Sequence, residues 1–313
     1  MGQLPMKISV VVPTYRRPRD LERCLAALSA QHRVADEILV VHRLQDDETH
    51  AVLAEPGWRA LEIKAVIVAK GGQVAALNCG LDAATGDIIA ITDDDAAPRP
   101  DWLLRIEKLF SADPLIVGVG GRDFVYENGA LLDGAQAVVG KVQWWGRCVG
   151  NHHLGVGPPR EVDLLKGANM SFRRSGLGDL KFDERLRGEG AQVGNDWKIA
   201  LSLRRAGGKL IYDPAVAVDH YPAVRHDAHK RDGVAAVAEY DKAHNVFLAL
   251  LEFLPAWRKP VFVVWSLLLG TRDVPGVLQA PRLWRLGLDS VGTRVTASLG
   301  GQLRGVRTWL DSR

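Results

Sequence analysis

Residues 87–95 read Asp-Ile-Ile-Ala-Ile-Thr-Asp-Asp-Asp, an apolar run that leads into three adjacent carboxylates. The run predicts a strand that is buried on both faces, as in a parallel sheet covered by helices. Ligands of such sheets bind beyond the carboxyl ends of the strands. Carboxylates crowded there raise one another's pKa unless a cation or hydrogen-bond donors compensate. Asp93, Asp94 and Asp95 therefore indicate either a metal site or a solvated turn, because Asp also favours turns.

A divalent cation is the ligand that best suits carboxylates at this position. Mg²⁺ and Mn²⁺ prefer carboxylate oxygens together with phosphate groups of a substrate. Such an ion would bridge a diphosphate and neutralise the charge that develops on a leaving nucleotide. His220 ends another apolar stretch, Val218-Asp219-His220. It either ligates the same metal, contacts the diphosphate or has only a structural role.

Strand-like and helix-like patterns alternate over the first 120 residues. The predicted strands cover residues 8–12, 37–41, 65–68, 87–92 and 116–119. Helical spacing of apolar residues predicts helices over residues 20–31, 73–84 and 102–110. This alternation predicts an α/β sandwich with a mainly parallel sheet. The carboxyl ends of its strands would bring Pro13-Thr14-Tyr15 and His42-Arg43 close to residues 92–95.

Two further segments stand at the starts of predicted helices. Gly71-Gly72 precedes one helix, so backbone N–H groups there can face an anion, although Gly-Gly is also an ordinary loop. Asp196 begins a helix predicted over residues 196–206, with a strand at residues 209–212 after it. Asp196 is either a helix cap or a general base that takes the proton of an attacking hydroxyl.

The composition excludes several other classes of protein. The chain has 313 residues, 47% of them hydrophobic and 25% charged, which fits a folded protein with a sizeable core. A net charge of +3 without a Lys/Arg block argues against nucleic-acid binding. The three cysteines stand far apart, which argues against a zinc site and fits a reducing compartment.

The C-terminal third is predicted to be mainly helical. Residues 244–254 and 261–269 are strongly apolar, and residues 271–313 contain seven Arg and no Lys. These segments either pack on the preceding domain or lie in the interface of an anionic membrane. No apolar run reaches the ~20 residues that span a bilayer, and residues 1–12 lack a signal-peptide pattern. We therefore expect a cytoplasmic protein, either free or peripheral on the inner face of the cell membrane.

Taken in order, the motifs resemble the family 2 inverting glycosyltransferases that build bacterial surface polysaccharides and have the GT-A fold. The resemblance rests on segments 11–17, 71–87, 92–95, 165–173 and 182–207. It implies a GT-A catalytic domain over residues 1–222 and a helical extension over residues 223–313. The domain would have a nucleotide-sugar half, about 1–120, and an acceptor half, about 121–222. The acceptor would be a glycan or a lipid-linked saccharide.

The resemblance also implies roles for single residues. Asp196 would be the base, while Asp95 and His220 would hold Mg²⁺ or Mn²⁺. The donor-binding residues would be Pro13, Thr14, Tyr15, Arg16, Arg43, Gly71, Gly72, Asn78, Asp93 and Asp94. The acceptor side would include Gly167, Asn169 and Trp197.

Two departures from the family pattern keep other functions open. The acidic residue expected after the second strand is replaced by His42-Arg43, although Asp46 or Asp47 can substitute for it. The expected Glu-Asp pair is Asn195-Asp196, with Glu184 and Glu189 as alternative bases. A nucleotidyltransferase that makes a nucleotide-sugar would share the fold and the metal. A membrane-associated scaffold that has lost the chemistry is the non-enzymatic alternative.

Overall fold

A ten-stranded sheet forms the middle layer of the computed structural model, which describes residues 5–223, 236–283 and 288–313. Its strand order is β10-β12-β6-β11-β4-β1-β2-β3, with β5 paired to β12 and β7 paired to β6. The strands are β1 (Ile8–Pro13), β2 (Glu37–His42), β3 (Ile63–Ile67), β4 (Ile88–Ile91), β5 (Ala96–Pro98), β6 (Ile116–Glu127), β7 (Ala130–Leu131), β10 (Arg160–Val162), β11 (Met170–Arg173) and β12 (Lys209–His220).

The neighbouring strands β3, β2, β1 and β4 pair in parallel, and so do β6 and β12. Strand β11 runs antiparallel between β4 and β6. The expected α/β/α sandwich with a mainly parallel sheet is therefore confirmed, with β11 as the antiparallel strand that joins the two halves. The carboxyl ends of β1, β2 and β4 lie at the same edge of the sheet.

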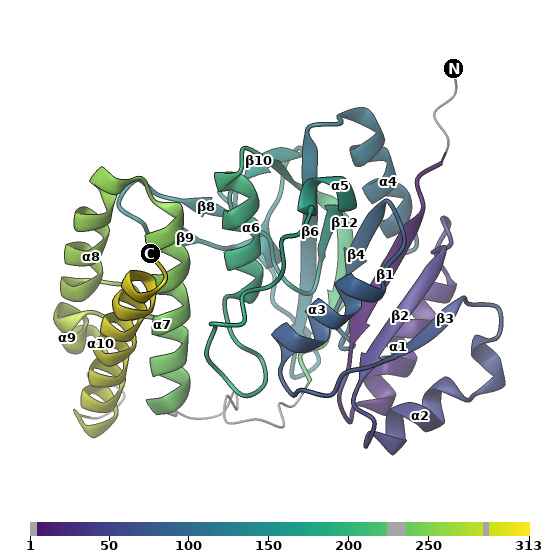
Figure 1. The fold of residues 1–313 in the computed structure, drawn as a ribbon, viewed down its shortest axis with the longest axis horizontal. Helices are drawn as coiled ribbons and strands as arrows, with labels where there is room; N and C mark the ends of the chain where they lie inside the picture. Colours follow the sequence, from purple (N-terminus) through teal and green to yellow (C-terminus); the bar gives the residue numbers. More distant parts are fainter. Residues whose placement is uncertain (1–4, 224–235, 284–287) are drawn as a thin grey trace.

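Helices cover both faces of the sheet, because each face carries its own set of buried side chains (Figure 1). One apolar core joins the sheet to α1 (Pro18–Ser29), α2 (Asp47–Leu53) and α4 (Trp102–Ala112). The other joins it to α3 (Gln73–Ala83), α5 (Arg174–Leu177) and α6 (Asn195–Arg205). Most predicted helices and strands agree with the structure within a few residues.

The remaining described helices gather at the end of the molecule opposite to β3 (Figure 1). They are α7 (Ala236–Phe253), α8 (Lys259–Leu268), α9 (Ala280–Leu283) and α10 (Leu288–Asp311). Leu250 and Leu251 of α7, Phe262 of α8 and Leu201 of α6 share a third apolar cluster. The expected helical C-terminal region is thus present and packs on α6. Within the described ranges, none of the helices has both the length and the hydropathy needed to cross a membrane.

The strand predicted at residues 116–119 is longer than expected. Strand β6 continues to Glu127, beyond the predicted end at residue 119. Strand β12, expected over residues 209–212, likewise continues to His220. The two long strands pair in parallel across a register shift between Asp213 and Ala217. This extension carries His220 and Asp123 to the edge of the sheet where β4 ends.

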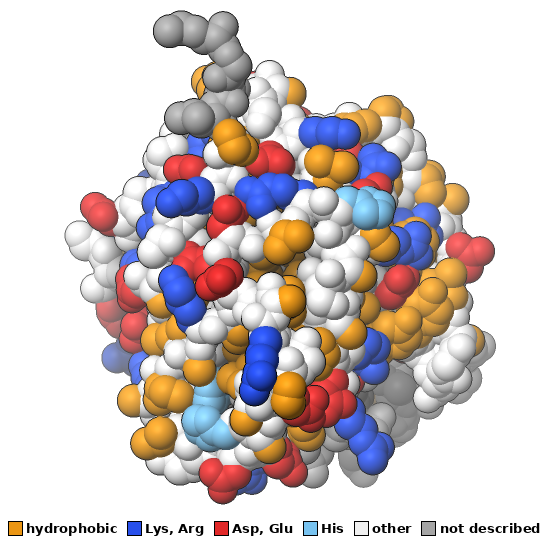
Figure 2. Space-filling model, turned by 90° about the vertical axis from the view of Figure 1, so that its right-hand side faces the viewer, with side chains coloured by type: hydrophobic (Ala, Val, Ile, Leu, Met, Phe, Trp, Pro, Cys, Tyr) orange, Lys and Arg blue, Asp and Glu red, His pale blue; other side chains and the backbone are white. Residues whose placement is uncertain are grey.

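The short segments between these elements complete the fold. They comprise the hairpin β8 (Lys141–Val142) and β9 (Cys148–Val149) and the 3-10 turns η1 (Pro56–Trp58), η2 (His152–Leu154), η3 (Ala256–Arg258) and η4 (Val277–Gln279). On the end of the molecule formed by β3, acidic and basic side chains are interspersed with apolar ones (Figure 2). This mixed surface agrees with the small net charge and offers no broad basic face for a nucleic acid.

Candidate active site

A cavity of about 1050 Å³ lies at the edge of the sheet where β1, β4 and β12 end. Residues from both halves of the chain line it, so the fold brings together segments that are far apart in sequence. The predicted site residues that line the cavity are Pro13, Thr14, Tyr15, Arg43, Gly72, Asp93, Asp94, Asp95, Gly167, Asp196, Trp197 and His220. Arg16, Gly71, Asn78 and Asn169 are absent from the lining.

Asp93, Asp95 and His220 form a compact group whose ligand atoms all lie within 4.8 Å of one another. His220 Nε2 is 3.2 Å from Asp95 Oδ1. Both atoms are buried, yet neither makes a hydrogen bond of acceptable geometry within the described residues. Buried polar atoms without hydrogen bonds are rare, and a cation satisfies a carboxylate oxygen and an imidazole nitrogen together. The residues present therefore fit a divalent metal.

The electrostatics of this group also favour a cation. Burial and the neighbouring Asp95 raise the pKa of Asp93 to about 6. Burial opposes ionisation of Asp95 as well, but the contact with His220 outweighs it and lowers the pKa of Asp95 to about 2. Burial lowers the pKa of His220, but the flanking carboxylates of Asp123 and Asp95 outweigh this effect and raise the pKa to about 9. A bound metal would replace the proton of His220 as the positive charge that these carboxylates face.

Asp94 points to protein groups rather than to the metal ligands. Its Oδ2 accepts a hydrogen bond from Thr14 Oγ1 at 2.8 Å, and its Oδ1 accepts one from Arg17 Nη1 at 2.9 Å. Asp94 is only 2% exposed. Asp94 therefore connects the loop after β1 to the loop after β4. Arg17 also lines the cavity, and it was not among the predicted site residues.

Asp123 and Lys166 are site residues that the sequence did not reveal. Asp123 lies on β6, is fully buried, and approaches His220 Nδ1 at 3.5 Å. Its other partner is the ammonium group of Lys166, which lines the cavity. A carboxylate behind a ligating histidine orients the imidazole ring and increases its basicity. The only available signal was the position of Asp123 in a Gly-rich stretch that did not read as a strand.

Asp196 lies in the first turn of α6. It is far from β4 in the sequence, but it lines the same cavity as the carboxylates that follow β4. Its Oδ1 accepts from the Trp197 N–H at 2.8 Å, and its Oδ2 accepts from the Gly167 N–H at 3.1 Å. Burial raises the pKa of Asp196, although these two N–H groups partly oppose that shift. A fixed carboxylate with a raised pKa that faces a cavity has the properties of a general base.

The first turn of α3 is already bonded to protein. Gln73 N donates to Gly190 O at 2.8 Å, and Val74 N donates to the side chain of Gln192 at 2.9 Å. Two of the N–H groups at this helix start are therefore occupied by Gly190 and Gln192. Gly71 instead makes room for Arg43, because a Cβ at Gly71 would lie 2.0 Å from Arg43 Nη2.

Three of the predicted site residues bond to nearby protein groups. The side chain of Asn78 exchanges two hydrogen bonds with the backbone of Phe182. Asn169 is buried and bonds to Trp102 and to Val216 O. The backbone N–H of Arg16 donates to Asp46, which also caps α2.

The alternative acidic residues can also be placed. Glu184 is exposed and pairs with Lys70, while Glu189 lines the cavity. His152 is buried against Leu164 O, and burial lowers its pKa to about 4. His153 also lines the cavity, so both adjacent histidines border it.

Comparison with solved structures shows that this chain shares its fold with a solved mannosyltransferase. A mannosyltransferase from Pyrobaculum calidifontis, solved in complex with GDP-mannose and Mn²⁺, is 18% identical. It matches 99% of this chain and 89% of its own with a TM-score of 0.56. This likeness identifies the fold as GT-A.

Curated relatives match shorter parts of the chain. An uncharacterised glycosyltransferase of Nostoc is 31% identical over 42% of this chain and 41% of its own length. A glucosyl-dolichyl phosphate glucuronosyltransferase of Haloferax volcanii is 24% identical over 69% of each chain. The chain thus spans about two fifths of the first of these relatives and about two thirds of the second.

The sequence also matches a family model over the N-terminal part of the elements that form the cavity. The match covers residues 9–175, which include β1, the carboxylates after β4 and the segment before β11. This span is more than half of the chain. The chain belongs to glycosyl transferase family 2.

Proposed function

We propose that this protein is a metal-dependent glycosyltransferase that moves a sugar from a nucleoside-diphosphate sugar to an acceptor hydroxyl with inversion. The observation that carries the proposal is the convergence of Asp93, Asp95, His220 and Asp196 on one cavity. A metal site and a candidate base that face the same space match the requirements of a direct displacement at the anomeric carbon.

In this proposal each side chain has a separate task. Asp95 and His220 hold Mg²⁺ or Mn²⁺, and Asp93 contacts the ribose or the sugar of the donor. The metal, when bound, supplies positive charge opposite the diphosphate. Asp196 accepts the proton of the acceptor hydroxyl, while its bonds to Gly167 and Trp197 hold the carboxylate in place. Direct attack from the side of Asp196 inverts the anomeric centre.

A thermal-shift screen tests the donor site. The protein is mixed with a panel of nucleoside-diphosphate sugars, each with Mn²⁺, with Mg²⁺ and with a chelator. A ligand at 100 times its Kd stabilises the folded state by about 2.7 kcal/mol. We expect stabilisation by at least one donor that disappears with the chelator. If no donor of the panel gave a larger thermal shift with metal than with the chelator, the proposal would be contradicted. Release of pyrophosphate from a nucleoside triphosphate and a sugar phosphate would favour a nucleotidyltransferase.

We further propose that the acceptor is a saccharide carried on a lipid. The part of the cavity beyond Asp196 has an apolar wall made by Val246, Leu250, Phe262 and Trp265 of α7 and α8. An apolar wall suits an apolar chain or the face of a sugar ring better than a charged group. One relative, from Haloferax volcanii, is named for glucosyl-dolichyl phosphate, which is such an acceptor.

The outer side of α8 supports contact with a membrane surface. Val264 and Leu268 lie four residues apart on α8 and are 56% and 48% exposed, and Trp257 of the preceding turn η3 is 70% exposed. Lys259 and Arg313 both lie over the ring of Trp309 nearby, at 4.6 and 3.9 Å from its centroid. An exposed apolar stripe beside clustered cations is typical of helices that lie in an anionic membrane interface. We therefore propose that the helical extension contacts the inner face of the cell membrane.

Flotation with liposomes tests this contact. The full chain is compared with a Val264→Glu, Leu268→Glu double variant on vesicles with and without anionic lipid. We expect the native chain to float with anionic vesicles and the double variant to remain in solution, with donor binding unchanged. Equal flotation of the two proteins, or none by either, would contradict membrane contact without touching the donor site.

A further inference from the structure

Residues 187–194 form a loop that touches both halves of the cavity. On the donor side, Gly190 O and the side chain of Gln192 accept the first N–H groups of α3. On the other side, the loop runs directly into α6 and Asp196, and Asn195 Nδ2 donates to Gln73 Oε1 at 3.3 Å. Gln73 in turn donates to Asp93 at 3.4 Å. The position of this loop therefore bears on the metal site and on the candidate base together.

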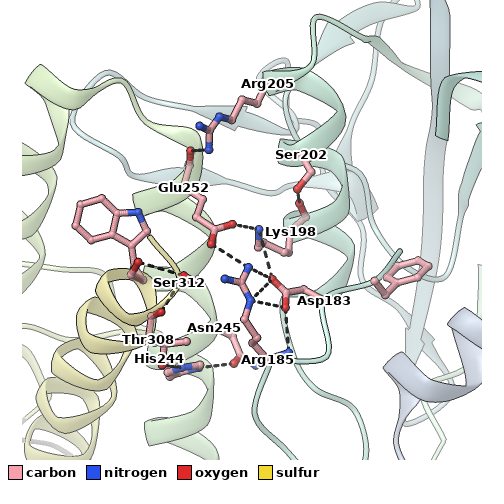
Figure 3. A network of polar contacts seen from close by, with 12 residues as sticks. Asp183, Arg185, Lys198, Ser202, Arg205, His244, Asn245, Glu252, Thr308 and Ser312 are labelled. Carbon is pink, nitrogen blue, oxygen red and sulfur yellow. Dashed lines mark hydrogen bonds and ion pairs between the residues drawn. The ribbon is translucent and has the colours of Figure 1, made fainter. Parts of the chain in front are cut away.

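A single side chain from α7 holds both ends of this loop. Asn245 is fully buried, and its Oδ1 accepts from Arg187 N at 2.8 Å. Its Nδ2 donates to Arg187 O and to Val193 O, each at 2.9 Å. His244 Nδ1 lies 2.9 Å from Oδ1 and completes the set of partners (Figure 3). An amide with both donors and its acceptor used fixes the backbone more tightly than an apolar contact of the same size.

Ion pairs also join α7 to the loop and to residues on either side of it, and Figure 3 shows those of Glu252 with Arg185 and Lys198. Arg187 Nε lies 2.8 Å from Asp241, and Arg185 lies 2.9 Å from Glu252. Lys198 of α6 is buried and pairs with the same Glu252. The helical extension is thus joined to the base-bearing helix through polar contacts as well as through the apolar cluster.

We infer that Asn245 is a positioning residue: it fixes the two ends of the loop 187–194 and thereby sets the place of Asp196 relative to Asp93. The inference rests on the proposed function for its effect on transfer, but the fixing of the loop does not. Asn245 reaches no reacting atom itself, because its partners are the backbone of the loop and His244. It would act on kcat by keeping the base in line with the metal-bound donor.

The test compares Asn245→Asp and Asn245→Ala with a matched control. Asn245→Asp keeps the shape and removes both N–H donors, while Asn245→Ala removes all the contacts and provides a second variant if the first does not fold. Gln302→Leu is the control, since Gln302 is equally buried on α10 and its side chain donates to Ser298. Hydrogen exchange of backbone amides, the donor Kd and kcat are measured for each folded protein.

We expect faster exchange in residues 186–194 and 73–74 of both Asn245 variants, and a kcat reduced at least about tenfold with a donor Kd changed less than about threefold. The control should match the native protein in both readouts. Unchanged exchange in these two segments would overturn the inference. Faster exchange in a protein that shows no transfer even in its native form would support the fixing of the loop and contradict the proposed function instead.

Discussion

Asp93, Asp94 and Asp95 are adjacent in sequence but face different partners. Asp95 faces His220 and accepts from Ala223 N at 2.8 Å, Asp94 bonds to Thr14 and Arg17, and Asp93 lies near Gln73. The protein groups compensate these charges only in part, because burial still raises the pKa of Asp93 to about 6 and that of Asp94 to about 7. The triplet is therefore both a candidate metal site and the connection between the loops after β1 and β4.

Asp123 provides a prediction about the support of the metal. Replacing Asp123 with Asn keeps the shape but removes the charge behind His220. We expect the affinity for Mn²⁺, measured by calorimetry in the presence of a nucleoside diphosphate, to fall about 10–100-fold. Asp219→Asn, next to His220 but paired with Arg99 near the surface, is the control and should change little. Equal affinities for the two variants would remove Asp123 from the site.

The raised pKa of Asp196 leads to a prediction about pH. A base acts in its deprotonated form, and burial raises the pKa of Asp196 above that of an exposed carboxyl. The transfer rate should therefore be constant at high pH and fall as the pH drops through this raised value, with unit slope in log kcat. A rate that stays constant down to the ordinary pKa of an aspartate, about 4, would contradict this role.

At the level of single residues, the sequence predicted the candidate metal ligands but not Asp123, which lies behind His220, or its partner Lys166. Asp93, Asp95 and His220 follow apolar runs, so the rule that ligands bind at strand ends could place them. Lys166 and Asp123 become neighbours only through the pairing of β6 with β11 and β12. Pairing between strands distant in sequence leaves no periodic signal in a single chain.

Strands β6 and β12 show how an element can exceed its sequence pattern. In the sequence, Gly120-Gly121 interrupts the apolar pattern that begins β6, and Pro214 interrupts that of β12. The pattern therefore predicted that both strands end at these residues. In the structure a Cβ at Gly121 would lie 1.6 Å from Val216 O. The glycine permits the close approach of the two strands at their register shift. A residue type that usually weakens a strand here makes its continuation possible.

Gly121→Ala tests this explanation. The added methyl group meets backbone atoms, which cannot rotate away, so we expect the free energy of unfolding to fall by about 1–3 kcal/mol. Urea denaturation of the purified proteins measures it. Gly57→Ala serves as the control, because no atom lies within 4 Å of its Cβ position. Equal midpoints for the two variants would show that β6 and β12 can separate without cost.

At the scale of the whole molecule, the helical extension and the catalytic layers share cores. Leu248 of α7 belongs to the same apolar cluster as the α3 and α6 side of the sheet, and Phe247 packs with Leu201 of α6. The sequence predicted a sandwich followed by helices, and both are present. It could not predict which surface the helices cover, because an apolar helix face does not specify its partner.

A chain that ends at residue 222 tests the proposed division at this point. Removal of α7 would expose Leu201 of α6 and leave Lys198 without Glu252. We expect this shorter chain to lose cooperative thermal unfolding or to aggregate, as monitored by circular dichroism and light scattering. A soluble, cooperatively folded fragment would show that residues 1–222 are an independent domain.

The central claim is that Asp93, Asp95, His220 and Asp196 form one metal-dependent transfer site. The most direct measurement compares the native enzyme with Asp196→Asn, using a donor found in the screen and following the sugar product and the donor Kd with Mn²⁺. The account predicts a loss of transfer of at least about 100-fold with a nearly unchanged donor Kd. Normal turnover by the Asp196→Asn enzyme would contradict it.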